Sequence, residues 1–127
     1  MIKILLGDDH KVVRRGVREL LEDREEWRVC GEAATGTQAV EIAAKLKPNI
    51  AVLDLLMPAM NGMDTIRRIR KVSPDTEILI LTMHTSQQLV RDAVRAGVRG
   101  FVLKFAGARN LIKAVEALVD HQSCLFI

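Results

Sequence analysis

Short apolar runs alternate with amphipathic stretches along the chain, and this alternation predicts strands and helices in turn. Runs rich in Ile, Val and Leu are typical of strands that are buried on both faces. Apolar residues that recur every three or four positions indicate a helix with one packed face. The predicted strands span 2–6, 27–33, 50–53, 77–81 and 101–103, and the predicted helices span 10–23, 37–46, 64–72, 86–96 and 109–120.

The five strand–helix units predict an α/β fold. Alternation of this kind requires a parallel sheet that helices cover on both sides. Right-handed crossovers restrict the topology, and the flavodoxin-like doubly wound order 2-1-3-4-5 is the leading candidate. A length of 127 residues suits one compact domain, and no internal repeat or low-complexity linker divides it. We therefore expect one domain over residues 1–122 and a tail over residues 123–127.

Polar residues stand where four of the predicted strands end. Asp8 and Asp9 follow the first strand, Asp54 the third, Thr82 the fourth and Lys104 the fifth. In the proposed order these four strands are neighbours, and ligand sites of doubly wound sheets lie at the carboxyl ends of the strands. We therefore expect three carboxylates, one hydroxyl and one ammonium group to meet in a single pocket.

The charge of this pocket indicates a divalent cation. Three carboxylates and one lysine sum to a charge of −2, and like charges held close together are costly unless they are neutralised. The available ligands are hard oxygens, which favour Mg²⁺ over zinc or copper. Neither His10 nor His84 is needed as a ligand.

Asp54 has a natural role beside such an ion. A carboxylate can act as a nucleophile on phosphorus and form an aspartyl phosphate. Catalysis of phosphoryl transfer consists mostly of positioning and charge stabilisation. Mg²⁺ and Lys104 would neutralise phosphoryl oxygens from two sides, and the Thr82 hydroxyl would donate a hydrogen bond to a third.

Each residue taken alone also has an ordinary structural explanation. Asp8 and Asp9 could form a turn that caps the following helix. Asp54 could be a loop acid, Thr82 a strand-end hydroxyl and Lys104 a solvated lysine. Only their joint placement on adjacent strand ends favours the functional interpretation.

Four segments of the sequence together resemble the receiver domains of bacterial two-component response regulators. They are GDDH at 7–10, AVLDLLMPAMNG at 51–62, LTMH at 81–84 and VLK at 102–104. The resemblance covers nearly the whole chain. It implies that Asp54 is the phosphoacceptor, that a histidine kinase or a small phosphodonor is the donor, and that Mg²⁺ is held by Asp9, Asp54 and the backbone carbonyl of Leu56, with Asp8 acting largely through water.

The resemblance also implies a switch. Thr82 and Phe101 would be the switch pair, in which the hydroxyl moves toward the phosphoryl group and the aromatic ring follows into the vacated space. This movement would change the surface formed by helix 86–96, strand 101–103 and helix 109–120.

The segment DDHKVVRRGVRELLE resembles the NarL/LuxR subfamily, whose receivers precede a helix-turn-helix DNA-binding domain. Such an output domain would follow a linker, and this chain stops too early to contain one. We favour a fragment over a stand-alone receiver. The switch would then control transcription through the missing output domain.

Some positions depart from the family pattern. Phe105 follows Lys104 where many receivers carry a proline, and the switch aromatic is Phe101 rather than tyrosine. Leu56 and His84 flank the site at positions where family members vary. We expect these two residues to set the lifetime of the phosphorylated state, Leu56 by screening the phosphoryl group from water and His84 by helping to position water.

Two other functional classes remain as alternatives. A phosphatase resembling the haloacid dehalogenase group would want a second acid two residues after the nucleophile, where this chain has Leu56. A degenerate binding module or a flavin-binding domain on a similar fold would not need the intact set of acids. We expect no enzymatic turnover beyond phosphorylation and dephosphorylation of the chain itself.

Composition adds little to the functional assignment. The net charge of +3 comes from basic residues spread over several predicted helices, and tyrosine is absent, so we interpret these charges as solvated helix faces rather than a nucleic-acid surface.

Cys30 and Cys124 are expected to be reduced thiols, with a disulfide as the alternative. No apolar run reaches the roughly 20 residues of a membrane span, and a cytoplasmic location is the default. Homodimerisation through helices 10–23 and 109–120, or through the switch surface, stays open.

Overall fold

The structure, a computed structural model, describes residues 1–83, 86–104 and 107–126, with the side chains of residues 125 and 126 left out. Strands and helices alternate throughout this part of the chain. The strands are β1 (Ile2–Gly7), β2 (Trp27–Ala33), β3 (Ile50–Leu53), β4 (Glu77–Thr82), β5 (Val98–Leu103) and β6 (Cys124–Phe126). The helices are α1 (Lys11–Glu22), α2 (Gly36–Leu46), α3 (Gly62–Val72), α4 (Gln87–Arg95) and α5 (Ala108–Val119).

The strands form one sheet in the order β2-β1-β3-β4-β5-β6, and every neighbouring pair is parallel. The predicted fold and the order of its first five strands are confirmed. β6 was not predicted, because three residues are too few to show the alternation that identifies a strand. Part of the expected tail 123–127 therefore extends the sheet beside β5.

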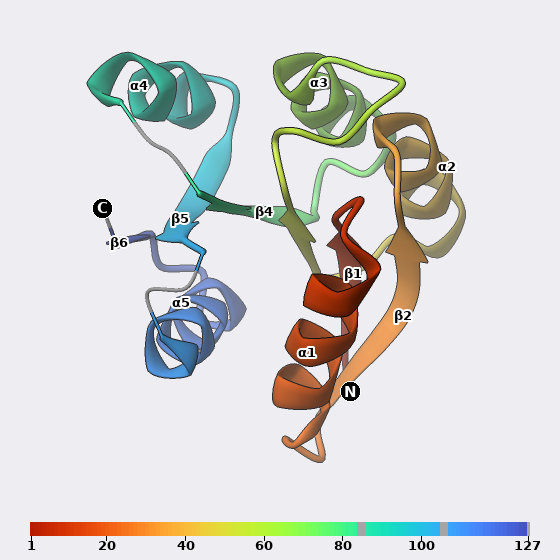
Figure 1. Ribbon diagram of the computed structural model, residues 1–127, viewed down its shortest axis with the longest axis vertical. Coiled ribbons are helices and arrows are strands. Elements are labelled where there is room, and N and C mark those ends of the chain that lie inside the picture. Colours follow the sequence, from red (N-terminus) through yellow and green to blue (C-terminus); the bar gives the residue numbers. More distant parts are fainter. Residues whose placement is uncertain (84–85, 105–106, 127) are drawn as a thin grey trace.

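Alternate residues of each strand enter separate cores, one on each face of the sheet. Ile4 and Val52 belong to the core that α1 and α5 cover, and Leu5 and Leu53 to the core under α2, α3 and α4. Figure 1 shows α1 and α5 in the lower half of the view and the other three helices in the upper half. Strands buried on both faces are the reason for the unbroken apolar runs in the sequence.

The turn after α5 directs the chain back onto the sheet edge. His121 adopts a left-handed backbone with φ of 60°, and the Gln122 N–H donates to the Ala117 carbonyl at 2.8 Å. This is the Schellman arrangement that commonly ends helices. Arg99 on β5 then donates from Nε to Ser123 Oγ at 3.0 Å. Together these contacts place β6 against β5.

Two expectations drawn from composition can be compared with the fold. Cys30 and Cys124 are both free, and they lie in β2 and β6 at opposite edges of the sheet, so the disulfide alternative is wrong. Among the helices of the described residues, none is both long enough and apolar enough to cross a bilayer.

Candidate active site

The carboxyl ends of β1, β3 and β5 bring Asp8, Asp54 and Lys104 together. Lys104 Nζ lies 2.8 Å from Asp54 Oδ2 and 2.7 Å from Asp8 Oδ2, and all three side chains are almost completely buried. Backbone hydrogen bonds place these residues: Asp8 N–H donates to the Ala33 carbonyl, Asp54 N–H to that of Gly7 and Lys104 N–H to that of Thr82. The convergence predicted for these three residues is therefore present.

The two carboxylates stabilise the charged form of Lys104. Burial lowers its pKa and is the largest single effect, but the hydrogen bonds and charges of Asp54 and Asp8 together outweigh it. The pKa of Lys104 consequently lies above its ordinary value, and the ammonium group stays charged at neutral pH. One cation is thus shared by two buried acids.

Asp54 is held through both of its carboxylate oxygens. Oδ2 faces Lys104, and Oδ1 accepts a hydrogen bond of 3.0 Å from the Leu56 N–H. The Leu56 side chain projects from the loop after β3 and is 67% exposed. The backbone of Leu56 therefore lies beside Asp54, while the use of its carbonyl as a metal ligand stays a prediction.

Asp9 and His10 form the exposed rim of the site. His10 Nδ1 lies 3.1 Å from Asp8 Oδ1 and 3.2 Å from Asp9 Oδ1. The His10 N–H also donates to Asp8 Oδ1 at 2.9 Å, which closes an Asx turn. The pattern of strand ends assigns no role to His10, yet the turn places its ring against both acids. Its position two residues after Asp8 was the available signal.

The donor atoms fit a hard divalent cation. Asp8, Asp9, His10 and Asp54 each offer one ligand atom, and these atoms lie within 4.8 Å of one another. Asp8 Oδ2 is buried and faces Lys104 Nζ at 2.7 Å, and no other group of the described residues donates a hydrogen bond to it. A buried carboxylate oxygen with unused acceptor capacity suits a cation. The oxygen-rich set is compatible with Mg²⁺.

Thr82 and Phe101 lie on the same face of the sheet. β4 and β5 pair Ile80 with Phe101 and Thr82 with Leu103, so Thr82 is the diagonal neighbour of Phe101. Thr82 is buried, and Phe101 is fully enclosed in the core under α2, α3 and α4. The aromatic ring is thus already in the interior. Its movement as part of a switch stays a prediction.

Two residues of the sequence argument, His84 and Phe105, lie outside the described residues. The expected role of His84 in setting the lifetime of the phosphorylated state therefore stays a prediction.

An ion-pair network on α1 supports the loop that carries Asp8. Arg14 donates from Nη1 to the Asp8 carbonyl at 2.6 Å, and its Nε lies 3.1 Å from Glu32 Oε1. Arg18 donates to the other oxygen of Glu32. The hydrogen bond from Arg18 is the main reason that the pKa of Glu32 is below its ordinary value. The interpretation of Arg14 as a solvated residue is wrong, because its side chain is only 16% exposed.

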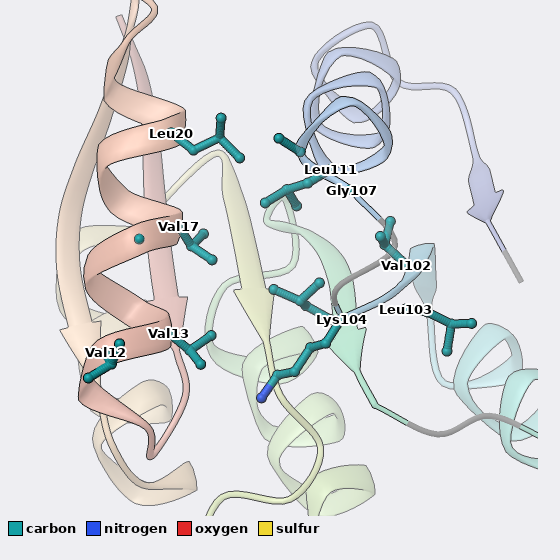
Figure 2. A pocket seen from close by; sticks show the side chains of 12 residues that line it. Val12, Val13, Val17, Leu20, Val102, Leu103, Lys104, Gly107 and Leu111 are labelled. Carbon is teal, nitrogen blue, oxygen red and sulfur yellow. The ribbon is translucent and has the colours of Figure 1, made fainter.

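An apolar pocket of about 500 Å³ lies between α1 and α5, and Lys104 is one of the residues that line it. Figure 2 shows Val13 and Val17 of α1 projecting toward Val102 and Leu111. The aliphatic stem of Lys104 lines one end, while its nitrogen leaves the pocket to meet Asp8 and Asp54. Lys104 thus lays its apolar stem along apolar side chains while its charged end lies among the acids.

Comparisons with known proteins agree with this geometry. A family model described as the response regulator receiver domain matches residues 4–116. The chain is 36% identical to the transcriptional regulatory protein YdfI of Bacillus subtilis over 119 residues, which is 94% of the chain and 55% of that protein. It is 40% identical to the DNA-binding transcriptional activator DevR/DosR of Mycobacterium tuberculosis over 125 residues, which is 98% of the chain and 58% of that protein.

Solved structures give the same match. A two-component response regulator of the LuxR family from Aurantimonas sp. SI85-9A1 superposes with a TM-score of 0.91 at 35% identity, covering 96% of this chain and 87% of that one. The chain spans only about half the length of the curated relatives that it matches. The activities of those longer proteins therefore cannot be transferred as a whole to this chain.

Proposed function

The chain belongs to the family of response regulator receiver domains, and from this membership we propose that it is a signalling switch that takes a phosphoryl group on Asp54. The observation that carries the proposal is the buried contact of Asp54 with Lys104 at 2.8 Å, beside Asp8. This contact supports the proposal, because phosphoryl transfer to an aspartate requires a carboxylate nucleophile with positive charge held beside it.

The chemistry follows from the positions of these side chains. An oxygen of Asp54 attacks phosphorus and forms a new O–P bond, while the bond from phosphorus to the donor breaks and the leaving group takes its electron pair. Lys104 neutralises charge on the phosphoryl oxygens, and the Thr82 hydroxyl donates a hydrogen bond to one of them. A bound Mg²⁺, held by Asp9, Asp54 and the Leu56 carbonyl with Asp8 acting through water, would supply further charge neutralisation.

Switching follows from the change in charge at Asp54. An acyl phosphate carries more negative charge than the carboxylate and offers new acceptor oxygens to Lys104 and Thr82. Thr82 shares a face of the sheet with Phe101, so a movement of its side chain opens space on the side of the aromatic ring. Reversing an equilibrium from 1:99 to 99:1 takes roughly 5.5 kcal/mol of differential stabilisation. Charge-assisted contacts in a buried site are of the strength needed.

The partners belong to the same proposal. The phosphodonor is a histidine kinase or a small phosphodonor in the cytoplasm, and the signal leaves through the surface of α4, β5 and α5. The relatives carry the words transcriptional and DNA-binding in their names, which supports control of transcription by an output domain beyond this chain. A homodimer through α1 and α5, or through α4, β5 and α5, is compatible with this role.

Labelling with a small phosphodonor tests the assignment of Asp54. The wild type, Asp54→Ala and Asp64→Ala are incubated with acetyl phosphate and Mg²⁺, and the phosphorylated fraction is measured by intact-protein mass spectrometry. Asp64 is a matched control because it is an exposed acid on α3. We expect labelling of the wild type and of Asp64→Ala and none of Asp54→Ala. Labelling of Asp54→Ala at the wild-type level would overturn the proposal.

A further inference from the structure

The outer edge of β5 carries an additional strand, which the chain itself supplies. β6 pairs with β5 in parallel, with residues 124–126 beside residues 100–102. Without β6, β5 would be the last strand of the sheet, and the main-chain N–H and C=O groups of its outer edge would lack partners in the sheet. An open edge of this kind accepts an extended segment as a further strand. The occupant in this structure is the segment that follows α5.

Residues 121–126, which we call the C-terminal strap, are held to β5 by few contacts. Arg99 of β5 donates from Nε to Ser123 Oγ at 3.0 Å and from Nη2 to the His121 carbonyl at 3.3 Å, and both contacts are exposed. Cys124 packs partly buried against the core under α1 and α5. A strand of three residues with so few contacts can detach while the rest of the domain stays folded. The strap is therefore an element with two states, paired and detached.

β5 connects the strap to the candidate active site. Lys104 follows β5 directly, and its Nζ lies 2.8 Å from Asp54 Oδ2. The Lys104 N–H donates to the Thr82 carbonyl at 2.6 Å, which ties the end of β5 to the end of β4. Phe101 lies within the same strand, and its partner in β6 is Leu125. β5 therefore contacts Asp54 beyond its carboxyl end and the strap along its outer edge.

The backbone of Phe101 is paired on both sides, with Ile80 of β4 and with Leu125 of β6. The direction of a side chain in a strand follows from the orientation of its backbone, so this pairing fixes where the ring points. The ring is fully enclosed in the core while β6 is in place. In the proposed switch, the ring enters the interior when the Thr82 hydroxyl turns toward the phosphoryl group. The strap and the phosphoryl group thus favour the same position of the ring.

We propose that the C-terminal strap is coupled to Asp54, so that a phosphoryl group on Asp54 tightens the pairing of β6 with β5. The coupling is reciprocal, because two events that favour one state each raise the affinity of the other by the same factor. Detachment of the strap therefore weakens the site for a phosphoryl group or its mimic. This inference rests on the proposed function and adds β6 as an element that responds to the state of Asp54.

Hydrogen exchange measures the tightening of the strap. Exchange of the β6 amides is followed by NMR in the wild type and in Asp54→Ala, with Mg²⁺ and with or without beryllofluoride as the phosphoryl mimic. We expect beryllofluoride to slow this exchange about fivefold or more in the wild type and to leave Asp54→Ala unchanged. The amides of β2, at the opposite edge of the sheet, are the internal control. An unchanged rate at β6, or equal slowing at β2 and β6, would overturn the inference.

Variants of the strap measure the reverse effect. The affinity for beryllofluoride with Mg²⁺ is determined by fluorine NMR for the wild type, Arg99→Ala, a variant that ends at Gln122, and Arg68→Ala. Arg68 is a matched control because it is an exposed arginine on α3. We expect the shortened variant to lose about fivefold or more in affinity, Arg99→Ala to lose less, and Arg68→Ala to bind like the wild type.

Arg99→Ala keeps the chain intact, so its result does not depend on the folding of the shortened variant. Faster exchange of the β6 amides in Arg99→Ala without any loss of beryllofluoride affinity would contradict the coupling. Labelling with acetyl phosphate separates this inference from the proposed function. Normal labelling of Asp54 with no effect of either strap variant would remove the strap from the mechanism and leave phosphoryl transfer intact. A wild type that is not labelled and does not bind beryllofluoride would remove the proposed function itself.

Discussion

Lys104 Nζ lies 2.8 Å from Asp54 Oδ2, so an ammonium group already faces the carboxylate that we propose as the phosphoacceptor. The same nitrogen lies 2.7 Å from Asp8 Oδ2. Lys104 therefore holds together two buried acids that would otherwise repel each other. Any charge added at Asp54 would therefore change how this one cation is shared between the two acids.

Lys104→Met removes the shared cation and should destabilise the metal-free protein by about 3 kcal/mol, because two buried carboxylates are then left without a partner. Mg²⁺ should restore part of the loss by supplying the missing positive charge. Urea unfolding with and without Mg²⁺ measures both effects. Lys45→Met, at an exposed position of α2, is the control. A loss that Mg²⁺ leaves unchanged would show that the pairing of charges is not its cause.

Glu32→Gln should lower the stability at neutral pH by about 0.5–1 kcal/mol, because Glu32 pairs with both Arg14 and Arg18. The pKa of Glu32 is lowered from 4.5 in the folded state, chiefly by the hydrogen bond from Arg18. Its contribution is therefore present above pH 4.5 and is lost as the pH falls through the folded pKa. The two stability curves should thus converge in acid. Unfolding in urea between pH 7 and pH 3 tests this, with the exposed Glu41→Gln as control.

Much of this arrangement was predictable because its signals are local. The alternation of strands and helices specifies the order of the first five strands, and strand ends specify where Asp54 and Lys104 meet. The rest depends on geometry that no short segment encodes. β6 is three residues long, and Gly100 weakens the apolar signal of β5, so the predicted strand began at residue 101 rather than at Val98. The contact of Arg14 with the Asp8 loop needs the packed position of α1.

Gly62→Ala should destabilise the protein by more than about 2 kcal/mol and slow phosphorylation. A Cβ at this position would lie 2.5 Å from the Leu55 carbonyl oxygen, which is backbone and cannot turn aside. The loop from Asp54 to α3 would have to move. Gly16→Ala is a contrasting control, because a Cβ there meets nothing within 4 Å and alanine favours helix, so we expect a gain of about 0.5–1 kcal/mol. Thermal unfolding measures both changes, and equal losses would contradict this account.

His121→Gly should stabilise the domain by roughly 1 kcal/mol, because glycine adopts a left-handed backbone without the steric cost that histidine pays at φ of 60°. The substitution retains the Schellman hydrogen bond from Gln122 to Ala117. Hydrogen exchange of the β6 amides should slow with it. His121→Ala separates the two contributions, since it removes the ring and keeps the strain. A gain equal for alanine and glycine would assign the effect to the side chain.

Leu56→Asn should shorten the lifetime of the phosphorylated state several-fold. Leu56 is 67% exposed and its N–H contacts Asp54 Oδ1, and we expect its side chain to screen a phosphoryl group on Asp54 from water. An amide at this position replaces an apolar screen with a group that can orient water. The decay of the phosphorylated fraction after removal of acetyl phosphate measures the lifetime. Leu56→Met keeps the screen apolar and should decay like the wild type, and equal rates for all three proteins would remove Leu56 from the control of lifetime.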